Sequence, residues 1–195
     1  MPELFLMVGL PGAGKSTRAG RLAIEHRALR LSPDEWMLPL FGVGDVDGRR
    51  DIVEARLIRL AWDALHVGTN VVLDFGFWGR DERTAIRWLA TGAGAVSHLV
   101  YLPVDHATQL ERVAHRQATK PWTTVPITEA DLHAWRAAFE EPDEAELSGT
   151  GGFAAPPQGS VGWLEWLSLR WPTLTFPEGE ATGPGRADHA RPEPA

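Results

Sequence analysis

Apolar and polar residues follow one another in blocks whose spacing predicts alternating strands and helices. Short apolar runs predict buried strands over Leu4–Val8, Ala28–Leu31, Asn70–Asp74 and Ser97–Leu102. Apolar residues at helical spacing predict helices over Arg18–Glu25, Arg50–His66 and Arg80–Thr91. Asp105 and Thr128 are typical N-cap residues, and they predict two further helices, to about Arg116 and to about Glu140. This alternation favours an α/β fold, with helices on both faces of a parallel sheet.

The pattern changes after Pro142. Ser148–Gly162 is rich in Gly, Pro and Ala and predicts a linker, while Val161–Trp171 predicts a short Trp-rich helix. Thr173–Phe176 is a candidate last strand. We therefore expect one domain over residues 1–147, a linker with a Trp-rich segment packed on the domain over residues 148–176, and a disordered tail over residues 177–195, where Pro and Gly are abundant.

A glycine-rich motif directly follows the first predicted strand. Gly9-Leu-Pro-Gly-Ala-Gly-Lys-Ser-Thr17 has the G-x-x-x-x-G-K-[ST] pattern (Walker A) of a phosphate-binding loop. Glycines let consecutive backbone amides turn toward an anion, and the N-terminus of the following helix adds partial positive charge. We expect Lys15 to reach the β- and γ-phosphates of a nucleotide and the Ser16 hydroxyl to hold Mg²⁺. The predicted nucleotide-binding residues are Gly9, Pro11, Gly12, Ala13, Gly14, Lys15, Ser16 and Thr17.

Two carboxylates follow the second and third predicted strands. Asp34 lies just past one strand and Asp74 ends the other. The carboxyl ends of strands in an open parallel sheet face one crevice, so both carboxylates should lie near the glycine loop. Asp34 is a candidate base for the proton of an acceptor hydroxyl, or alternatively a helix cap. Asp74 is a candidate ligand of Mg²⁺, or alternatively a turn residue before Phe75.

Aromatic and basic residues complete the candidate site. The aromatic residues close to the two carboxylates would let an apolar acceptor stack, unless they are ordinary core residues; they are Trp36, Phe75, Phe77 and Trp78. Arg80 and Arg83 would bind an anionic part of the acceptor, or are surface charges. Arg112 and Arg116 lie four apart on one helix face and would close over the phosphates as a lid, or form a solvated basic face.

Composition narrows the class of protein. The chain has 195 residues, 44% of them hydrophobic, which suffices for a core. Its net charge of −7 disfavours a protein whose whole surface binds nucleic acid. Cysteine is absent, so disulfides and thiolate chemistry are excluded. The sequence contains no apolar run long enough to span a membrane, and we expect a cytoplasmic protein that uses ATP and Mg²⁺.

Three of these motifs together resemble a known family. Gly9–Thr17, Ser32–Trp36 and the Arg112/Arg116 pair look like the small P-loop kinases that include chloramphenicol phosphotransferase, zeta toxins and polynucleotide 5′-kinases. The resemblance covers about residues 3–140. It implies an adenylate-kinase-like fold with a parallel sheet of strand order 2-3-1-4-5. It also implies transfer of the γ-phosphate of ATP to a hydroxyl, with Asp34 as base, Asp74 as the strand-three acid, and Arg112 and Arg116 as lid cations.

We therefore expect an ATP-dependent phosphotransferase. Its acceptor would be a hydroxyl of a small molecule, antibiotic-like or nucleotide-sugar-like. One alternative is a polynucleotide 5′-kinase, which the net charge of −7 disfavours. The others are a nucleotide-binding regulatory module without transfer activity and a zeta-type toxin.

Overall fold

The computed structural model describes residues 1–42, 47–120 and 126–177. The strands are β1 (Glu3–Val8), β2 (Leu29–Leu31), β3 (Val71–Gly76) and β4 (Val96–Tyr101). The helices are α1 (Lys15–Glu25), α2 (Pro33–Phe41), α3 (Arg49–His66), α4 (Arg80–Gly92), α5 (His106–Thr119), α6 (Glu129–Ala138), α7 (Glu144–Ser148) and α8 (Trp163–Arg170). The expected tail lies, from residue 178 on, outside the described residues.

The strands form a parallel sheet in the order β2-β3-β1-β4. This confirms the expected α/β fold and the first four positions of the expected strand order. Within the described residues a fifth strand is absent, so the prediction of a strand over Thr173–Phe176 was wrong. That segment instead packs on α3: Leu174 is buried, the Phe176 ring meets Trp62 at 5.4 Å, and Arg59 donates to the Thr175 carbonyl at 3.3 Å. Its apolar side chains are thereby buried on a helix, so the segment does not pair with the sheet.

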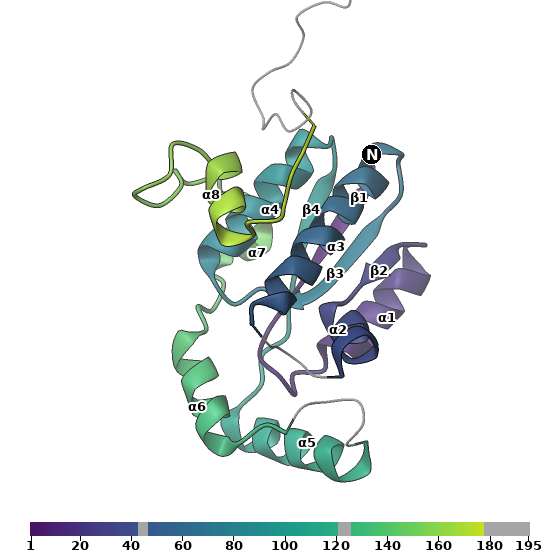
Figure 1. Cartoon of the computed structure of the whole chain (residues 1–195), viewed down its shortest axis with the longest axis vertical. Helices are drawn as coiled ribbons and strands as arrows, with labels where there is room; N and C mark the ends of the chain where they lie inside the picture. The colour runs from purple at the N-terminus through teal and green to yellow at the C-terminus, as the bar shows by residue number, and fades with distance from the viewer. Residues whose placement is uncertain (43–46, 121–125, 178–195) are drawn as a thin grey trace, which may run out of the picture.

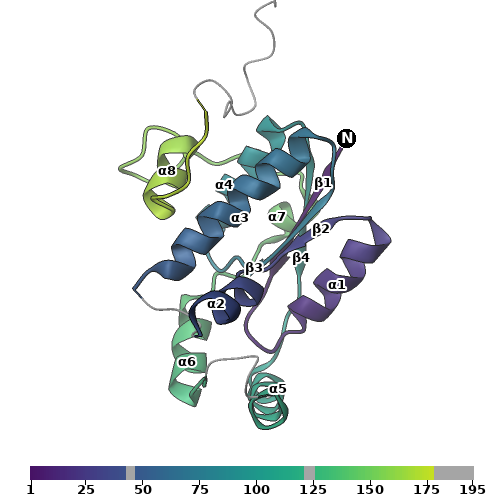
Figure 2. The same ribbon diagram turned by 45° about the vertical axis from the view of Figure 1, so that its right-hand side comes forward.

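Helices cover both faces of the sheet, with α1 on one side and α3 and α4 on the other (Figure 1, Figure 2). The alternation of side chains along β1 explains both layers. Leu4, Leu6 and Val8 join the larger core cluster with α3 and α4. Phe5 and Met7 point the other way, into a smaller cluster with α1. A central strand that is apolar on both faces is typical of a parallel sheet of this kind.

The C-terminal helix α8 lies beside α4 (Figure 1). Trp163, Leu167 and Trp171 are buried in the larger core cluster. The Trp171 indole also donates to the Glu54 carboxylate of α3 at 3.0 Å, which satisfies its polar atom. The Trp-rich segment therefore covers apolar surface of α3 and α4 and is tied to α3 by a hydrogen bond.

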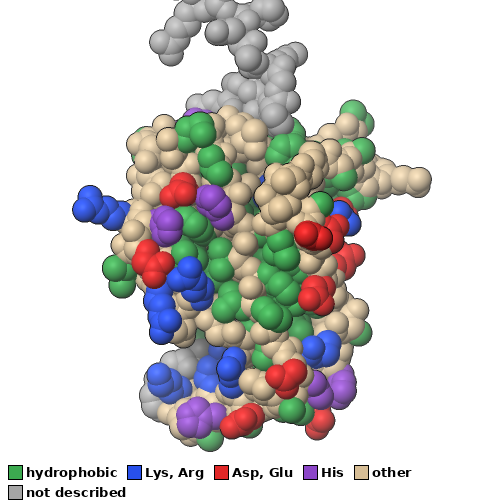
Figure 3. Space-filling model, turned by 180° about the vertical axis from the view of Figure 1, so that it is seen from behind, with side chains coloured by type: hydrophobic (Ala, Val, Ile, Leu, Met, Phe, Trp, Pro, Cys, Tyr) green, Lys and Arg blue, Asp and Glu red, His purple; other side chains and the backbone are tan. Residues whose placement is uncertain are grey.

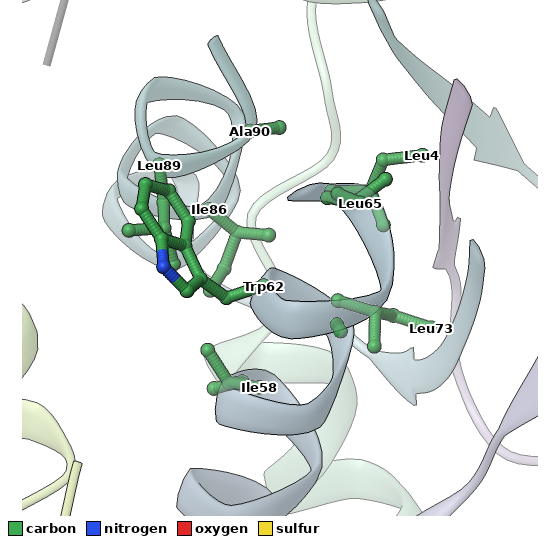
Figure 4. A pocket seen from close by; sticks show the side chains of 9 residues that line it. Leu4, Ile58, Trp62, Leu65, Leu73, Ile86, Leu89 and Ala90 are labelled. Carbon is green, nitrogen blue, oxygen red and sulfur yellow. The ribbon is translucent and has the colours of Figure 1, made fainter. Parts of the chain in front are cut away.

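A small cavity lies between α3, α4 and the sheet (Figure 4). Its volume is about 10 Å³, and the side chains that line it are all apolar. A void of this size holds at most one water molecule. It is a packing defect of the core and too small for a ligand. No helix in the described part of the chain combines the length and apolar character that a bilayer span needs.

Candidate functional site

The glycine loop joins β1 to α1 at the carboxyl edge of the sheet. Gly9, Gly12 and Gly14 have φ of 143°, 83° and 92°, a region that L side chains rarely adopt. A Cβ on Gly9 would lie 2.7 Å from the Leu102 carbonyl oxygen, so only glycine fits there. The loop is anchored to the sheet because the Gly9 amide donates to the Gly76 carbonyl at 3.1 Å. The backbone is thus held in the turned conformation that an anion-binding loop requires.

The other residues of the motif follow in order. Pro11 accepts a hydrogen bond from the Gln109 side chain at 3.1 Å, and Ala13 is buried. α1 begins at Lys15, with Ser16 and Thr17 exposed in its first turn. The N-terminus of α1 therefore faces the same space as the loop, where its free amides and partial positive charge favour an anion.

Lys15 carries a positive charge that its surroundings do not favour. Its ammonium donates to the Leu10 carbonyl at 2.9 Å. Its pKa falls from 10.5 to about 8, chiefly because burial disfavours the charged form. Nearby carboxylates oppose this fall and nearby guanidinium groups add to it; they belong to Asp74, Asp34, Arg116 and Arg50. A bound anion would supply the missing compensation, so the site suits phosphate.

Asp74 is buried in β3, two residues before the strand ends at Gly76, and pairs with Arg30 of β2 at 3.0 Å. Arg30 also pairs with Glu35 at 2.8 Å. The sequence reasoning missed Arg30, because only the register of β2 on β3 brings it to Asp74. Arg30 stands opposite Val72 in the parallel register, so Asp74, two residues further on, lies on the same face of the sheet.

Asp34 lies in the first turn of α2, where Ser32 and not Asp34 occupies the N-cap position. Its exposed carboxylate pairs with Arg50 of α3 at 2.8 Å. Arg50 in turn pairs with Glu54 at 3.0 Å. The sequence reasoning also missed Arg50, because an arginine in the first turn of a helix carries no local sign of the carboxylate that it meets in another element.

The aromatic residues fall into different environments. Phe77 is 3% exposed and stacks on Phe75 with 5.3 Å between ring centroids. The core-packing alternative therefore holds for Phe77. Trp78 is half-buried against Trp135 of α6, at 5.7 Å. Trp36, beside Asp34 in α2, is 47% exposed and free to meet a ligand.

Both predictions for Arg83 were wrong. It is not a surface charge, and it is not open to an anionic part of an acceptor. It is fully buried and pairs with Glu146 of α7 through two hydrogen bonds of 2.8 and 3.0 Å. Its remaining amine donates to backbone carbonyls of the segments before α4 and after α6, namely those of Phe77, Trp78 and Glu140. Arg80 is exposed and pairs with Asp143 at 2.7 Å. Arg83 thus joins α4 to α7 and to the segments before α4 and after α6.

Helix α5 packs directly on the glycine loop. Arg112 donates to the Gly12 carbonyl at 3.2 Å, and Gln109 reaches the Pro11 carbonyl. Arg116 is half-buried and close enough to Lys15 to lower the pKa of its ammonium. Within the described residues, the buried Nε of Arg116 has no hydrogen-bond partner. The structure therefore gathers Lys15, Asp34, Asp74 and Arg116 at the carboxyl edge of the sheet.

The chain matches a known protein family over most of its length. The model of a family described as an AAA domain (AAA_33) matches residues 4–142, which is most of the chain. The chain belongs to this family. The match includes the glycine loop, both carboxylates and α5. No curated protein matches the chain significantly.

Solved structures share the fold at low sequence identity. The Pnkp1/Rnl/Hen1 RNA repair complex contains a chain with a TM-score of 0.61 and 17% identity, which covers 78% of this chain and 47% of that one. Kti12 from Chaetomium thermophilum, in complex with ADP-AlF3, has a TM-score of 0.56 and 16% identity over 89% of this chain and 100% of that one. A gluconokinase from Sinorhizobium meliloti 1021 has a TM-score of 0.52 and 17% identity over 89% of this chain and 91% of that one. The family and these structures confirm the expected small P-loop kinase-like fold.

Proposed function

We propose that the protein is an ATP-dependent phosphotransferase that moves the γ-phosphate of ATP to a hydroxyl of a small molecule, antibiotic-like or nucleotide-sugar-like. The observation that carries the proposal is the state of Lys15. Its ammonium is half-buried beside a glycine loop, with its pKa lowered to about 8. Such a cation is matched to a ligand that brings negative charge, and the phosphates of a nucleotide do so.

The loop amides and the N-terminus of α1 would hold the β- and γ-phosphates, with Lys15 between them. Ser16 and Asp74 offer the hard oxygen donors that Mg²⁺ prefers, and a bound Mg²⁺ would neutralise phosphate charge. Asp74 already pairs with Arg30 at 3.0 Å, so its carboxylate would be shared between that guanidinium and the ion. The likeness to Kti12 with bound ADP-AlF3 supports a nucleotide ligand for this fold.

Asp34 is the best placed base for the acceptor. Its carboxylate is exposed, on the same edge of the sheet as the loop, and the ion pair with Arg50 at 2.8 Å orients it. It would accept the proton of the acceptor hydroxyl while that oxygen bonds to the γ-phosphorus and the bond to the β-phosphate oxygen breaks. Glu35 is the neighbouring carboxylate, but its ion pair with Arg30 engages it elsewhere. Arg112 and Arg116 of α5 would offset the charge on the phosphates.

A screen of hydroxyl acceptors for ATP-dependent phosphorylation, read by mass shift, tests the proposal. Lys15→Ala should abolish both MgATP binding and transfer. Asp34→Asn should lower turnover by about 10²- to 10⁴-fold, the usual contribution of a general base, with little change in MgATP affinity. Glu35→Gln is the matched control, since it also removes a carboxylate charge from an ion pair of α2. Near-normal turnover of Asp34→Asn would overturn the assignment of the base.

The same screen separates the alternatives. Transfer to the 5′-hydroxyl of an oligonucleotide, with an affinity that falls steeply with salt, would identify a polynucleotide kinase. Slow ATP hydrolysis without any acceptor, unchanged by Asp34→Asn, would identify a regulatory module. We keep the polynucleotide kinase as an alternative because a chain of the RNA repair complex shares this fold.

A further inference from the structure

Helices α5 and α6 bring two histidines and a glutamate together outside the crevice. His106 opens α5, Glu129 opens α6, and His133 follows one turn later. One potential ligand atom from each of the three residues lies within 4.8 Å of the other two. Glu129 and His133 lie four apart on one helix, but His106 lies 23 positions before Glu129, so the sequence contains no recognisable three-residue metal motif. Only the packing of the two helices creates the cluster.

The separations suit a small metal ion after minor side-chain rotation. The rings of His106 and His133 have centroids 4.6 Å apart. A Glu129 carboxylate oxygen lies 3.9 Å from Nε2 of His133. Ligand atoms about 2.1 Å from a tetrahedral ion lie about 3.4 Å from one another. Glu129 and His133 are exposed, so they can make this adjustment and an ion can reach them.

His106 adds a separate observation. Its Nδ1 is buried and makes no hydrogen bond to any residue that the structure describes. Buried polar atoms without a partner are rare in folded proteins. Coordination of an ion through this nitrogen would satisfy it.

The surrounding charge also tolerates a cation. Both helices begin at the cluster, and their N-termini carry partial positive charge. The cap carboxylates offset this charge: Asp105 accepts from the Thr108 amide at 2.8 Å, and Asp131 accepts from the Thr128 amide at 2.8 Å. In the view from behind, histidine, acidic and basic side chains all stand at the lower end of the molecule, where α5 and α6 lie (Figure 3).

We propose that His106, Glu129 and His133 bind a transition-metal ion of the Zn²⁺ class, which clamps α5 to α6. Two imidazoles and one carboxylate are a donor set that Zn²⁺ prefers and that Mg²⁺ does not. The clamp acts next to the proposed phosphotransfer site without belonging to it. Gln109 of α5 already joins Arg136 of α6 at 2.7 Å and the Pro11 carbonyl at 3.1 Å. The ion therefore restrains the helix pair that rests on the glycine loop.

Titration of the metal-free full-length protein with Zn²⁺, against a chromophoric chelator, tests the site. The wild type should bind one equivalent. His106→Ala and His133→Ala should each weaken binding by at least about tenfold, since even the loss of a partner behind a ligand costs 10- to 100-fold. His115→Ala is the matched control, because His115 is exposed on α5 outside the cluster. Equal affinity of the wild type and the His106→Ala/His133→Ala double variant would overturn the proposal and leave adventitious binding.

A second measurement covers the case in which a histidine variant fails to fold. Glu129→Gln changes an exposed side chain and should still weaken Zn²⁺ binding; unchanged affinity would contradict the site. Hydrogen exchange should show slower exchange of α5 and α6 amides on addition of Zn²⁺ to the wild type, with no change in Glu129→Gln. Slowing that is equal in both proteins would overturn the clamp.

Discussion

Replacement of Lys15 by methionine should stabilise the nucleotide-free protein while it destroys nucleotide binding. Lys15→Met keeps the length of the side chain and removes its charge. The folded protein holds the pKa of the ammonium at about 8 against an ordinary value of 10.5, chiefly through burial. That difference corresponds to about 3 kcal/mol of unfavourable free energy at neutral pH. The variant also loses the hydrogen bond to the Leu10 carbonyl, worth about 1 kcal/mol, so the net gain should be about 2 kcal/mol.

The pH dependence of the stability difference distinguishes the loss of a buried charge from mere repacking of the side chain. Below pH 8 Lys15 is charged in both the folded and the unfolded chain, so the folded wild type bears the full cost. Between pH 8 and 10.5 the folded protein loses this proton first, and the unfolded chain binds more protons. The stability of the wild type should therefore rise with pH relative to Lys15→Met. The advantage of the variant should shrink to under about 1 kcal/mol near pH 9.5.

Urea unfolding of both proteins without nucleotide, at pH 7 and near pH 9.5, measures the difference. Excess MgATP supplies the functional half of the test. At about 100 times its Kd it should stabilise the wild type by about 2.7 kcal/mol and leave Lys15→Met unchanged. A variant less stable than the wild type at pH 7, or a difference that does not vary with pH, would refute the reasoning that the loop keeps an uncompensated cation for its ligand.

Two further substitutions test the framework of the site. Glu146→Ala leaves the fully buried guanidinium of Arg83 without its carboxylate and should cost about 3–5 kcal/mol of unfolding free energy in urea; a loss below about 1 kcal/mol would contradict the buried ion pair. Gly9→Ala places a Cβ 2.7 Å from the Leu102 carbonyl oxygen at a φ of 143°, and isothermal titration should show MgATP binding lost. Gly20→Ala of α1, where a Cβ meets nothing within 4 Å, is its control and should bind MgATP normally.

The sequence alone determined the features that rest on short-range pattern. The apolar run before the glycine loop predicted β1, and the 3.6-residue periodicity predicted α3 as Arg50–His66 against the observed Arg49–His66. Such elements are predictable because a strand or helix needs a local run of side chains with the right period. The glycine loop was predictable for a similar reason, since its left-handed backbone conformations require glycine at defined positions.

The tertiary structure alone decided which charges meet. Arg83 could be taken for a surface charge until the fold buried it against Glu146, 63 positions further along the chain. Asp74 met Arg30 only through the register of β2 on β3. A charged side chain carries the same local signal whether it faces water or a distant partner. Its role follows from which surfaces the core brings into contact, and hydrophobic burial over the whole chain decides that.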